Sequence, residues 1–294
     1  MKILSPAKIN FFLHVRGKRP DGYHELFSLM CRINLFDKIT LQIGDTHEDG
    51  VEIYCSHPEV PADATNLAYQ AARLFQSRLN TAEGIKIHLE KHIPVGAGLG
   101  GGSSNAASVL LALNTYYRHP FSPRHLMELG LKLGADVPFF IFQKPAIATG
   151  VGEKLEAFQG DLPYHILLIY PGFSVSTAAV YQNLNLGLTK DKKKPTSNHL
   201  KPNRFNLVDH LSNDLEQVTA LKYPEIGWAK EKLLKSGAAG ALMSGSGPTV
   251  FGLFDNIDTA KTAKQTLSTD HAGKDLQLFL ADPILSADFK LIEP

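Results

Sequence analysis

The chain has 294 residues, with 30 basic and 29 acidic side chains and a formal net charge of +1. This near balance predicts neither nucleic acid nor a membrane as a partner, because both are recruited by a strong positive field. A hydrophobic fraction of 44% is ordinary for a globular protein, and the length favours two domains or a two-lobed enzyme. A small-molecule substrate is therefore the first expectation.

The N-terminus does not resemble a targeting signal. Its apolar residues are interrupted by Pro6, Lys8 and Asn10, and no apolar run of the chain approaches the roughly 18 residues that span a bilayer. The two cysteines, Cys31 and Cys55, have no metal-binding spacing and fit a reducing compartment, although two cysteines could pair. We therefore expect a cytoplasmic protein without a dedicated metal site.

Strands dominate the first part of the chain. Residues 2–15 predict an opening strand with a break at Pro6, in which Lys8 and Asn10 project to one face. From spacing alone these two polar side chains could simply be solvent-exposed. A turn is expected at residues 16–25, where Pro-Asp-Gly carries the local chemistry. The strands expected next cover residues 26–33, 37–43 and 51–54.

Helices and strands then alternate on either side of a glycine-rich loop. Thr65-Asn66-Leu67 predicts the start of a helix with apolar residues in helical spacing. The alternation at residues 84–90 predicts a strand with one buried face, which leads into the loop. The elements expected after the loop are a buried helix at 105–117, a helix at 123–133, an apolar strand at 139–142 and a strand at 146–151.

A second lobe is predicted from about residue 160 onward. It opens with an apolar strand at residues 164–170 and a helix that starts by Thr177 and carries Tyr181. The lysine-rich stretch at residues 188–203 is typical of a solvated loop. The remaining expected elements are helices at 207–211, 214–219, 225–236 and 259–267, a strand–turn–strand unit at 240–254 and a strand at 276–280. The predicted fold class is therefore α+β, with domains at residues 1–160 and 161–294.

The most distinctive stretch is residues 94–107. Five of the seven residues from Gly96 to Gly102 are glycine, and two serines follow. Glycine at this density costs backbone entropy, so some group must approach the backbone closely. Because free N–H groups and the dipole at a helix start attract anions, the stretch predicts a phosphate cradle. The alternative, a tight strand–helix turn, would need only one or two glycines.

Three common phosphate loops fit this stretch poorly. A P-loop needs a lysine directly before its serine, but Gly102 precedes Ser103. The dinucleotide fingerprint is matched by Gly96, Gly98 and Gly101, yet no acid follows within the next 20 or so residues to hold a ribose. The protein-kinase triplets His-Arg-Asp and Asp-Phe-Gly are also missing from the sequence.

The stretch instead resembles the nucleotide-binding motif of the GHMP kinases, the superfamily of galactokinase, homoserine kinase and mevalonate kinase. Two further superfamily motifs match in order, Pro-Ala-Lys-Ile-Asn at residues 6–10 and Met-Ser-Gly-Ser-Gly-Pro-Thr at residues 243–249. Residues 19–26, 133–138 and 171–177 resemble one branch of it, whose members phosphorylate the 2-hydroxyl of 4-(cytidine 5'-diphospho)-2-C-methyl-D-erythritol in the non-mevalonate isoprenoid pathway. The resemblance covers essentially the whole chain.

This resemblance implies a two-lobed fold with a ribosomal-protein-S5-like N-terminal lobe and a ferredoxin-like C-terminal lobe. It implies ATP as the phosphoryl donor, with Mg²⁺ as its companion ion. Asp136 would be the general base, and Lys8 would keep that carboxylate ionised and offset charge on the moving phosphoryl group. The residues that it assigns to ATP are Pro94, Val95, Gly96, Ala97, Gly98, Leu99, Gly100, Gly101, Gly102, Ser103 and Ser104, with Asn66, Leu67 and Lys91 on the adenine side.

For the cytidine end, the resemblance implies two stacking aromatics, Tyr23 and Tyr181. His24 and Asn10 would read the polar edges of the substrate, with Thr177 as a weaker candidate. Without the resemblance, a Tyr-His pair after a turn, such as Tyr23-His24, usually lies on the protein surface. An aspartate after a helix-ending glycine, such as Asp136, could merely organise a turn. Three other functions stay open, namely a GHMP kinase of the homoserine or mevalonate type, a Rossmann oxidoreductase and a non-catalytic binding protein on this fold.

Overall fold

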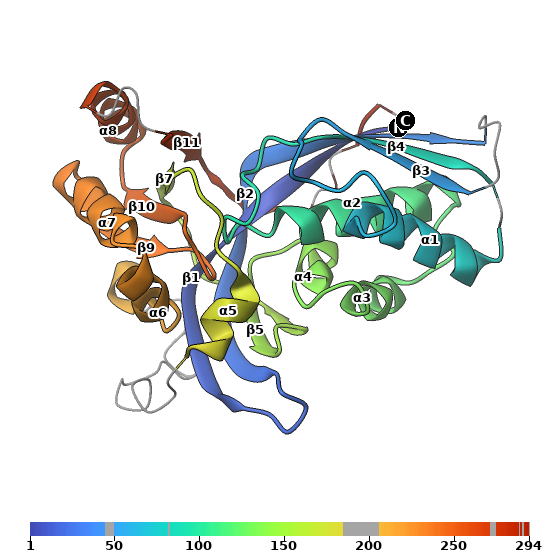
Figure 1. Ribbon diagram of the computed structural model, residues 1–294, viewed down its shortest axis with the longest axis horizontal. Helices are drawn as coiled ribbons and strands as arrows, with labels where there is room; N and C mark the ends of the chain where they lie inside the picture. Colours follow the sequence, from blue (N-terminus) through green and yellow to red (C-terminus); the bar gives the residue numbers. More distant parts are fainter. Residues whose placement is uncertain are drawn as a thin grey trace.

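The computed structural model describes residues 1–44, 50–81, 83–184, 206–270, 275–287, 289 and 291–293. Figure 1 shows two lobes side by side, each built on its own sheet and its own helices, as the α+β prediction requires. The expected lysine-rich loop at residues 188–203 lies outside the described residues. Within the described ranges, no helix has both the length and the apolar character needed to cross a membrane.

One long hairpin organises the N-terminal lobe. β1 (Lys2–Lys18) and β2 (His24–Ile43) pair antiparallel along almost their whole length. The predicted break at Pro6 is wrong, because a register shift between Pro6 and Ala7 accommodates the residue that lacks an N–H. The same shift explains why β2 runs on where two separate strands were predicted. The other strands of this sheet are β3 (Val51–Cys55), β4 (Ile85–Glu90), β5 (Ala146–Gly150), β6 (Lys154–Ala157), β8 (Ser212–Asn213), β12 (Pro283–Ile284) and β13 (Leu291–Glu293).

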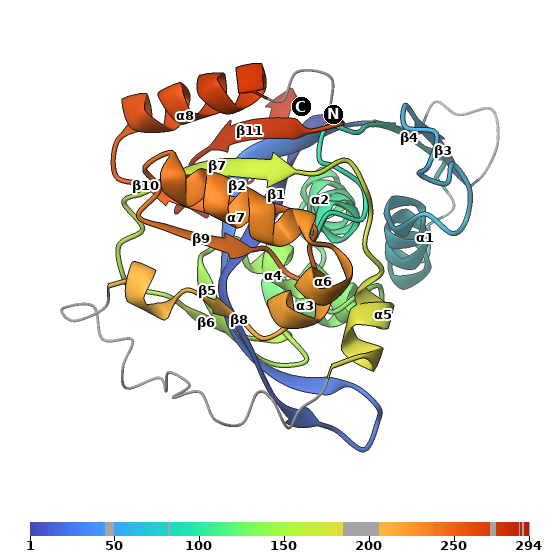
Figure 2. The same ribbon diagram turned by 60° about the vertical axis from the view of Figure 1, so that its left-hand side comes forward.

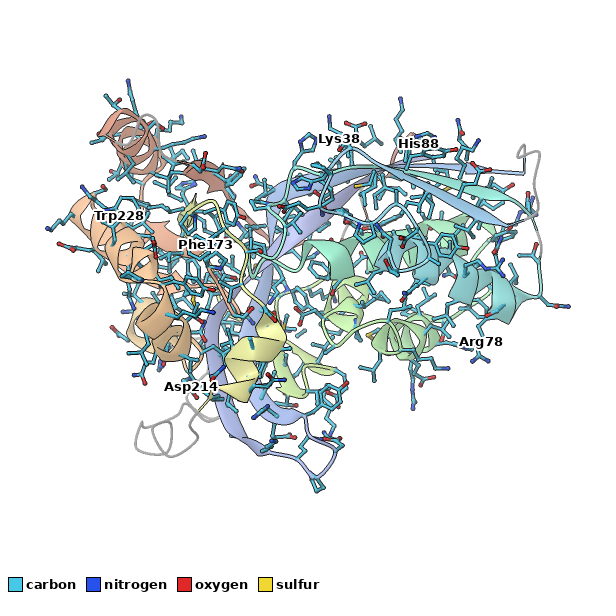
Figure 3. The ribbon with its side chains drawn as sticks, in the orientation of Figure 1. Lys38, Arg78, His88, Phe173, Asp214 and Trp228 are labelled. Carbon is cyan, nitrogen blue, oxygen red and sulfur yellow. The ribbon has the colours of Figure 1, made fainter. Side chains whose placement is uncertain are left out.

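The helices of this lobe lie on one side of its sheet (Figure 1). They are α1 (Leu67–Leu79), α2 (Gly101–Tyr116), α3 (Pro123–Leu131) and α4 (Val137–Phe142). Figure 3 shows the side chains of Lys38 and His88 projecting from the opposite side of the sheet, and both are exposed. The helix α1 starts where residues 65–67 predicted it, and Asn66 caps it by accepting a 2.9 Å hydrogen bond from the N–H of Ala68.

Two predicted elements of this lobe need correction. The helix α2 begins at Gly101 rather than at residue 105, so the last two glycines belong to its first turn. The apolar run at residues 139–142 is helical rather than a strand, because Pro138 sits in the first turn of α4, where its missing N–H costs no hydrogen bond. Phe139, Phe140 and Ile141 are all buried, so the run shows no alternation that could separate helix from strand.

The C-terminal lobe has a four-stranded antiparallel sheet in the order β11–β7–β10–β9. Its strands are β7 (His165–Tyr170), β9 (Gly240–Met243), β10 (Val250–Phe254) and β11 (Gln277–Ala281). The helices that follow residue 170 are α5 (Thr177–Gln182), α6 (Glu216–Lys222), α7 (Glu225–Lys235) and α8 (Ile257–Asp270). Figures 1 and 2 show α7 and α8 on the outer side of this sheet. Where a helix was expected at 207–211 there is only a 3₁₀ turn at Val208–His210, and α6 begins two residues later than predicted.

One of the hydrophobic clusters of the molecule joins the two sheets. Phe11 and Phe12 from β1 belong to the same buried cluster as Leu168 from β7 and Phe251 from β10, and the rings of Phe11 and Phe251 meet edge to face at 6.0 Å. The chain also returns to the first sheet at its end, because β12 pairs with β2 and β13 with β1. These contacts join the two lobes to each other.

Candidate active site

A cavity of about 870 Å³ opens between the two lobes. This volume lies within the roughly 300–1,000 Å³ that is usual for ligand sites. Every site residue predicted from the sequence lines it except Ser104. The sequence did not point to several further lining residues, among which are Leu13, Lys18, Leu26, Ser28, Met30, Glu59 and Leu215.

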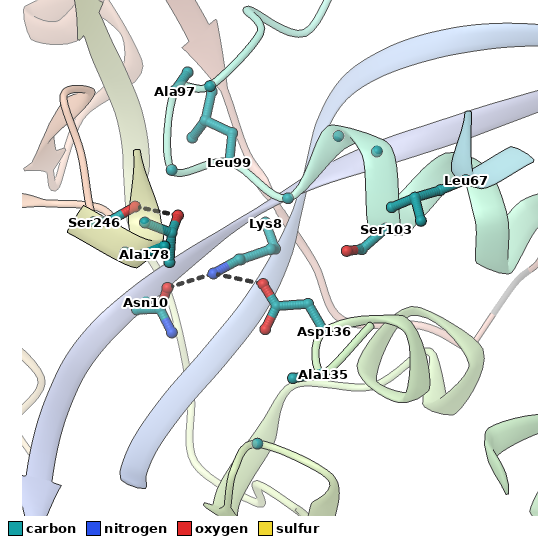
Figure 4. A pocket seen from close by; sticks show the side chains of 18 of the residues that line it. Lys8, Asn10, Leu67, Ala97, Leu99, Ser103, Ala135, Asp136, Ala178 and Ser246 are labelled. Atoms are coloured by element: carbon teal, nitrogen blue, oxygen red, sulfur yellow. Dashed lines mark hydrogen bonds and ion pairs between the residues drawn. The ribbon is translucent and has the colours of Figure 1, made fainter. Parts of the chain in front are cut away.

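At the centre of the cavity the ammonium of Lys8 lies between two oxygen acceptors (Figure 4). Its Nζ is 3.3 Å from Asp136 Oδ2 and donates a 2.7 Å hydrogen bond to Asn10 Oδ1. The Asn10 amide in turn donates to Ser28 Oγ at 2.8 Å. Lys8 and Asn10 therefore share a strand face as predicted, but that face is buried, with the residues only 5% and 2% exposed. The alternative of a solvated polar pair is excluded.

Different elements position the two members of the ion pair. The backbone N–H of Lys8 donates to the carbonyl of Leu99 at 2.9 Å, which fixes β1 against the glycine loop. Asp136 directly precedes α4, and the tight turn before it is closed by a hydrogen bond from the Val137 N–H to the Gly134 carbonyl. The Asp136 side chain keeps 36% of its surface exposed. A buried cation thus holds a carboxylate that still faces the cavity.

The glycine loop is packed against protein at three of its positions. Gly96, Gly98 and Gly100 all have positive φ, a backbone region that favours glycine. A Cβ on Gly98 would lie 2.1 Å from the carbonyl oxygen of Ser244, and one on Gly96 would lie 2.6 Å from Ser174 Cβ. The predicted close approach is therefore confirmed, but at these two positions the approaching group is the C-terminal lobe.

The carbonyl oxygens of the loop are held by the second lobe. Ser244 Oγ donates to the Gly98 carbonyl at 3.1 Å, and the Val175 N–H donates to the Gly96 carbonyl at 3.0 Å. Beyond them, Gly101, Gly102 and Ser103 line the cavity in the first turn of α2, a 16-residue helix with no acidic residue in that turn. Because the first N–H groups of a helix have no intrahelical acceptor, this turn can bind an anion.

The two serines after the loop have different surroundings. Ser103 lines the cavity. Ser104 is 0% exposed, and its Oγ shares a 2.8 Å hydrogen bond with Ser5 Oγ. Successive residues of a helix point about 100° apart, so only one of a pair can face a given site. The sequence carried no signal for which serine that would be.

The aromatic side chains lie at the other end of the cavity. Tyr181 from α5 stacks on His24 with ring centroids 5.1 Å apart, and Tyr23 is 62% exposed at the rim. Burial raises the pKa of the Tyr181 hydroxyl, with a smaller contribution from the charge of Asp136. Burial also lowers the pKa of His24, which favours a neutral imidazole at pH 7. The structure thus brings Tyr23 and Tyr181 to one cavity, with the His24 ring rather than that of Tyr23 on the face of Tyr181.

Two polar side chains of the C-terminal lobe meet beside this aromatic end. Thr177 Oγ1 and Ser246 Oγ share a hydrogen bond of 2.8 Å (Figure 4). Ser246 belongs to the turn between β9 and β10, which the sequence identified only as a motif without separate roles. On the opposite side of the cavity, Asn66 and Leu67 lie at the start of α1, beside the first turn of α2.

Two superfamily domains match the chain. The family described as GHMP kinases N terminal domain matches residues 66–144, and GHMP kinases C terminal matches residues 200–272. A homoserine kinase of Cytophaga hutchinsonii shares the fold, with a TM-score of 0.75 at 18% identity over 97% of this chain and 95% of that one. The class of protein that the two-lobed fold and the glycine loop define is therefore the GHMP kinase, which uses ATP.

Relatives with higher sequence identity show to which family of GHMP kinases the chain belongs. The 4-diphosphocytidyl-2-C-methyl-D-erythritol kinase of Syntrophotalea carbinolica is 47% identical over 90% of this chain and 94% of its own, and that of Geobacter sp. strain M21 is 46% identical over 90% and 92%. A crystal structure of 4-(cytidine 5'-diphospho)-2C-methyl-D-erythritol kinase superposes with a TM-score of 0.78 at 35% identity, over 96% of this chain and 99% of that one. The chain belongs to the 4-diphosphocytidyl-2-C-methyl-D-erythritol kinase family.

Proposed function

We propose that the chain transfers the γ-phosphoryl group of ATP to the 2-hydroxyl of 4-(cytidine 5'-diphospho)-2-C-methyl-D-erythritol. The observation that carries this proposal is the Lys8–Asp136 pair, which lies in one cavity between the first turn of α2 and the aromatic residues. Phosphoryl transfer asks a protein mainly for positioning and for neutralisation of negative charge. This cavity offers a cation, a carboxylate and a helix N-terminus.

In this reaction Asp136 acts as the general base. Its carboxylate accepts the proton of the 2-hydroxyl as the oxygen attacks the γ-phosphorus and the bond from that phosphorus to the ADP oxygen breaks. Lys8 holds the Asp136 carboxylate in place and offsets charge on the transferred group, because its ammonium is buried between Asp136 and Asn10. Asn10 and Ser28 hold that ammonium at one place.

The nucleotide occupies the loop side of the cavity in this proposal. The backbone N–H groups of Gly101, Gly102 and Ser103 bind the phosphates, and Asn66 and Leu67 flank the adenosine. Lys91 lies on the adenosine side as well, but its ammonium packs against Gly101 in the phosphate-binding turn. No cluster of three or more His, Cys, Asp or Glu side chains suited to a metal ion occurs within the described ranges. The Ser103 hydroxyl, which lines the cavity in the first turn of α2, fits Mg²⁺, because this ion prefers oxygen ligands and is often held by substrate phosphates with few protein groups. Ser103 Oγ would be its protein ligand, and the ion would neutralise phosphate charge.

The substrate occupies the aromatic end in this proposal. Tyr23 and Tyr181 stack on the cytosine, while His24, Asn10 and Thr177 supply polar contacts. Because His24 faces Tyr181 in the structure, binding requires the His24 ring to move aside and leave that face to the base. A neutral imidazole can both donate to and accept from a pyrimidine edge.

The position of the new phosphate tests this function. We expect ³¹P NMR of the product to show one new phosphomonoester resonance without three-bond coupling to a proton, because C2 of the methylerythritol carries no hydrogen, and the two diphosphate resonances of the cytidine end to be retained. A phosphate on any other hydroxyl, or release of inorganic phosphate alone, would contradict the proposed geometry of Asp136.

Replacing Lys8 by methionine tests the role of the ammonium. We expect Lys8→Met to lower kcat by about 10²-fold or more, the scale of a lost charge-stabilising group, with small changes in both KM values. Lys230→Met is the matched control, because Lys230 also pairs with a carboxylate, Glu216, but lies outside the cavity. If both variants turned over normally, Lys8 would have no part in the chemistry.

Replacing Tyr181 by leucine tests the aromatic end. Base–aromatic stacking contributes about 1–3 kcal/mol, so we expect Tyr181→Leu to raise KM for the cytidine substrate about tenfold and to leave KM for ATP unchanged. Tyr223→Leu removes a similar stacked pair, formed with Phe173 at a centroid distance of 4.8 Å, from outside the cavity. An equal effect of the two variants on KM would count against the stacking role.

A further inference from the structure

A buried carboxylate that the proposed chemistry does not use lies behind the glycine loop. Asp37 of β2 is 0% exposed. Its Oδ1 accepts hydrogen bonds from the backbone N–H groups of His92 and Ile93 at 2.8 and 2.9 Å. Its Oδ2 accepts from the ammonium of Lys91 and, at 3.0 Å, from the side-chain amide of Asn105. Four donors therefore fill the accepting capacity of one carboxylate.

Lys91 is held by this carboxylate at the edge of the nucleotide side. Its side chain is only 4% exposed, yet the residue lines the cavity. The ammonium also donates to Asn105 Oδ1 at 3.1 Å. An ammonium has three N–H donors, so the hydrogen bonds described for Lys91 leave one donor for a ligand.

The same group of residues fixes the start of α2. A Cβ on Gly101 would lie 3.1 Å from Lys91 Nζ, so the ammonium packs directly against the first turn of the helix. Asn105, one turn further along α2, links Asp37 to Ser5 through a 3.0 Å hydrogen bond from its amide. Asp37 thus ties together β1, β2, the entry to the glycine loop and α2.

We propose that Asp37 is a positioning residue for the ATP phosphates and acts through Lys91. The negative charge of Asp37 keeps a buried ammonium beside the helix N-terminus, where that ammonium adds a positive charge and one free donor to the anion site. Without Asp37, the buried ammonium of Lys91 would lose the carboxylate that it pairs with, and its side chain would move to another position. This inference rests on the proposed function, because it takes ATP as the ligand of this turn.

The variant Asp37→Asn keeps the shape of the side chain and one oxygen for the two backbone donors, but it removes the charge. We expect the dissociation constant of a non-hydrolysable ATP analogue, measured by calorimetry, to rise about tenfold, in line with loss of one charge-assisted hydrogen bond. KM for ATP should rise in parallel, while kcat and KM for the cytidine substrate stay within about twofold. A purely structural defect would instead lower all of these together.

Glu216→Gln is the matched control. Glu216 likewise accepts a hydrogen bond from a backbone N–H, that of Met243, and an ion pair from a lysine, Lys230, but it lies outside the cavity. We expect this variant to bind the ATP analogue as the unchanged chain does. A rise equal to that of Asp37→Asn would assign the effect to stability and overturn the inference.

The double variant shows whether Asp37 acts through Lys91. We expect Asp37→Asn combined with Lys91→Met to bind the analogue no more weakly than Lys91→Met alone, because the second change then removes nothing further. Additive losses would overturn the inference.

If Asp37→Asn fails to fold, Asn105→Leu replaces it in these measurements. We then expect the dissociation constant of the ATP analogue to rise about threefold while kcat is retained. Unchanged affinity would likewise overturn the inference.

The failure of the proposed function would look different. If the unchanged chain, folded and monodisperse, did not bind the ATP analogue at all, the proposed function itself would be wrong, and the role of Asp37 with it. If the unchanged chain binds the analogue and Asp37→Asn binds it equally well, only the inference on Asp37 is wrong.

Discussion

The variant Asp136→Asn should fold and bind both substrates but lose about 10²–10⁴-fold in kcat, the range for a removed general base. An amide cannot accept the proton of the substrate hydroxyl, and it leaves the buried Lys8 ammonium without a negative partner. The native Asp136 side chain is 36% exposed, and its one described ion pair is with Lys8. We therefore expect the fold to tolerate the change. The measurement is steady-state kinetics with ATP and the cytidine substrate, together with a thermal unfolding curve.

The matched control for this prediction is Asp282→Asn. The Asp282 carboxylate also has a close side-chain partner, with His165 Nδ1 at 2.7 Å, but Asp282 lies outside the cavity. We expect it to keep the kcat of the unchanged chain. Turnover by Asp136→Asn within about threefold of that value would remove Asp136 from the role of base.

The variant Gly98→Ala should lose ATP binding more completely than any other single substitution in the loop. The φ of Gly98 is +76°, and a left-handed conformation costs a residue with a Cβ about 1–2 kcal/mol. The new Cβ would also lie 2.1 Å from the Ser244 carbonyl oxygen, which is backbone and has little freedom to move. The loop must therefore shift away from the C-terminal lobe, and we expect the affinity for an ATP analogue to fall at least tenfold, measured by calorimetry.

Gly227→Ala is the control for this prediction, because it adds the same methyl group at a position outside the glycine loop. Gly227 lies in α7, its φ is not positive, and a Cβ there would meet nothing within 4 Å. We expect this variant to bind ATP normally and to unfold at the same or a slightly higher temperature, because alanine favours helix. Normal ATP affinity in Gly98→Ala would show that the contact with Ser244 is not needed for the site.

Much of the fold followed from local chemistry in the sequence. The alternation in β4, the cap at Asn66 and the apolar run of β7 each indicated the element that forms, because the pattern reports directly on burial or on a helix end. The errors at Pro6 and at residues 139–142 have a common cause. The structure of each stretch depends on residues far away in the sequence. Pairing with β2 keeps the stretch around Pro6 in a strand, and packing on all sides makes the uniformly apolar stretch a helix.

In the candidate site, too, the sequence predicted some features, while others depend on contacts between residues far apart in the chain. The glycine density, together with the resemblance of the motifs around Lys8 and Asp136 to those of the GHMP kinases, identified residues that the structure brings to one cavity. The sequence could not show that Gly98 packs on Ser244, residues 146 positions apart, or that Ser104 turns inward to Ser5. Asp37 gave no signal at all, since a single aspartate within a strand pattern normally indicates an exposed position.

The central claim is that this cavity binds ATP beside a cytidine-diphosphate substrate and joins the two through Lys8 and Asp136. Its most direct test is ADP release, measured by a coupled assay with four acceptors in parallel: 4-(cytidine 5'-diphospho)-2-C-methyl-D-erythritol, homoserine, mevalonate and galactose. We predict rapid ADP formation with the first acceptor and background rates with the other three. Turnover confined to homoserine, mevalonate or galactose would contradict the account.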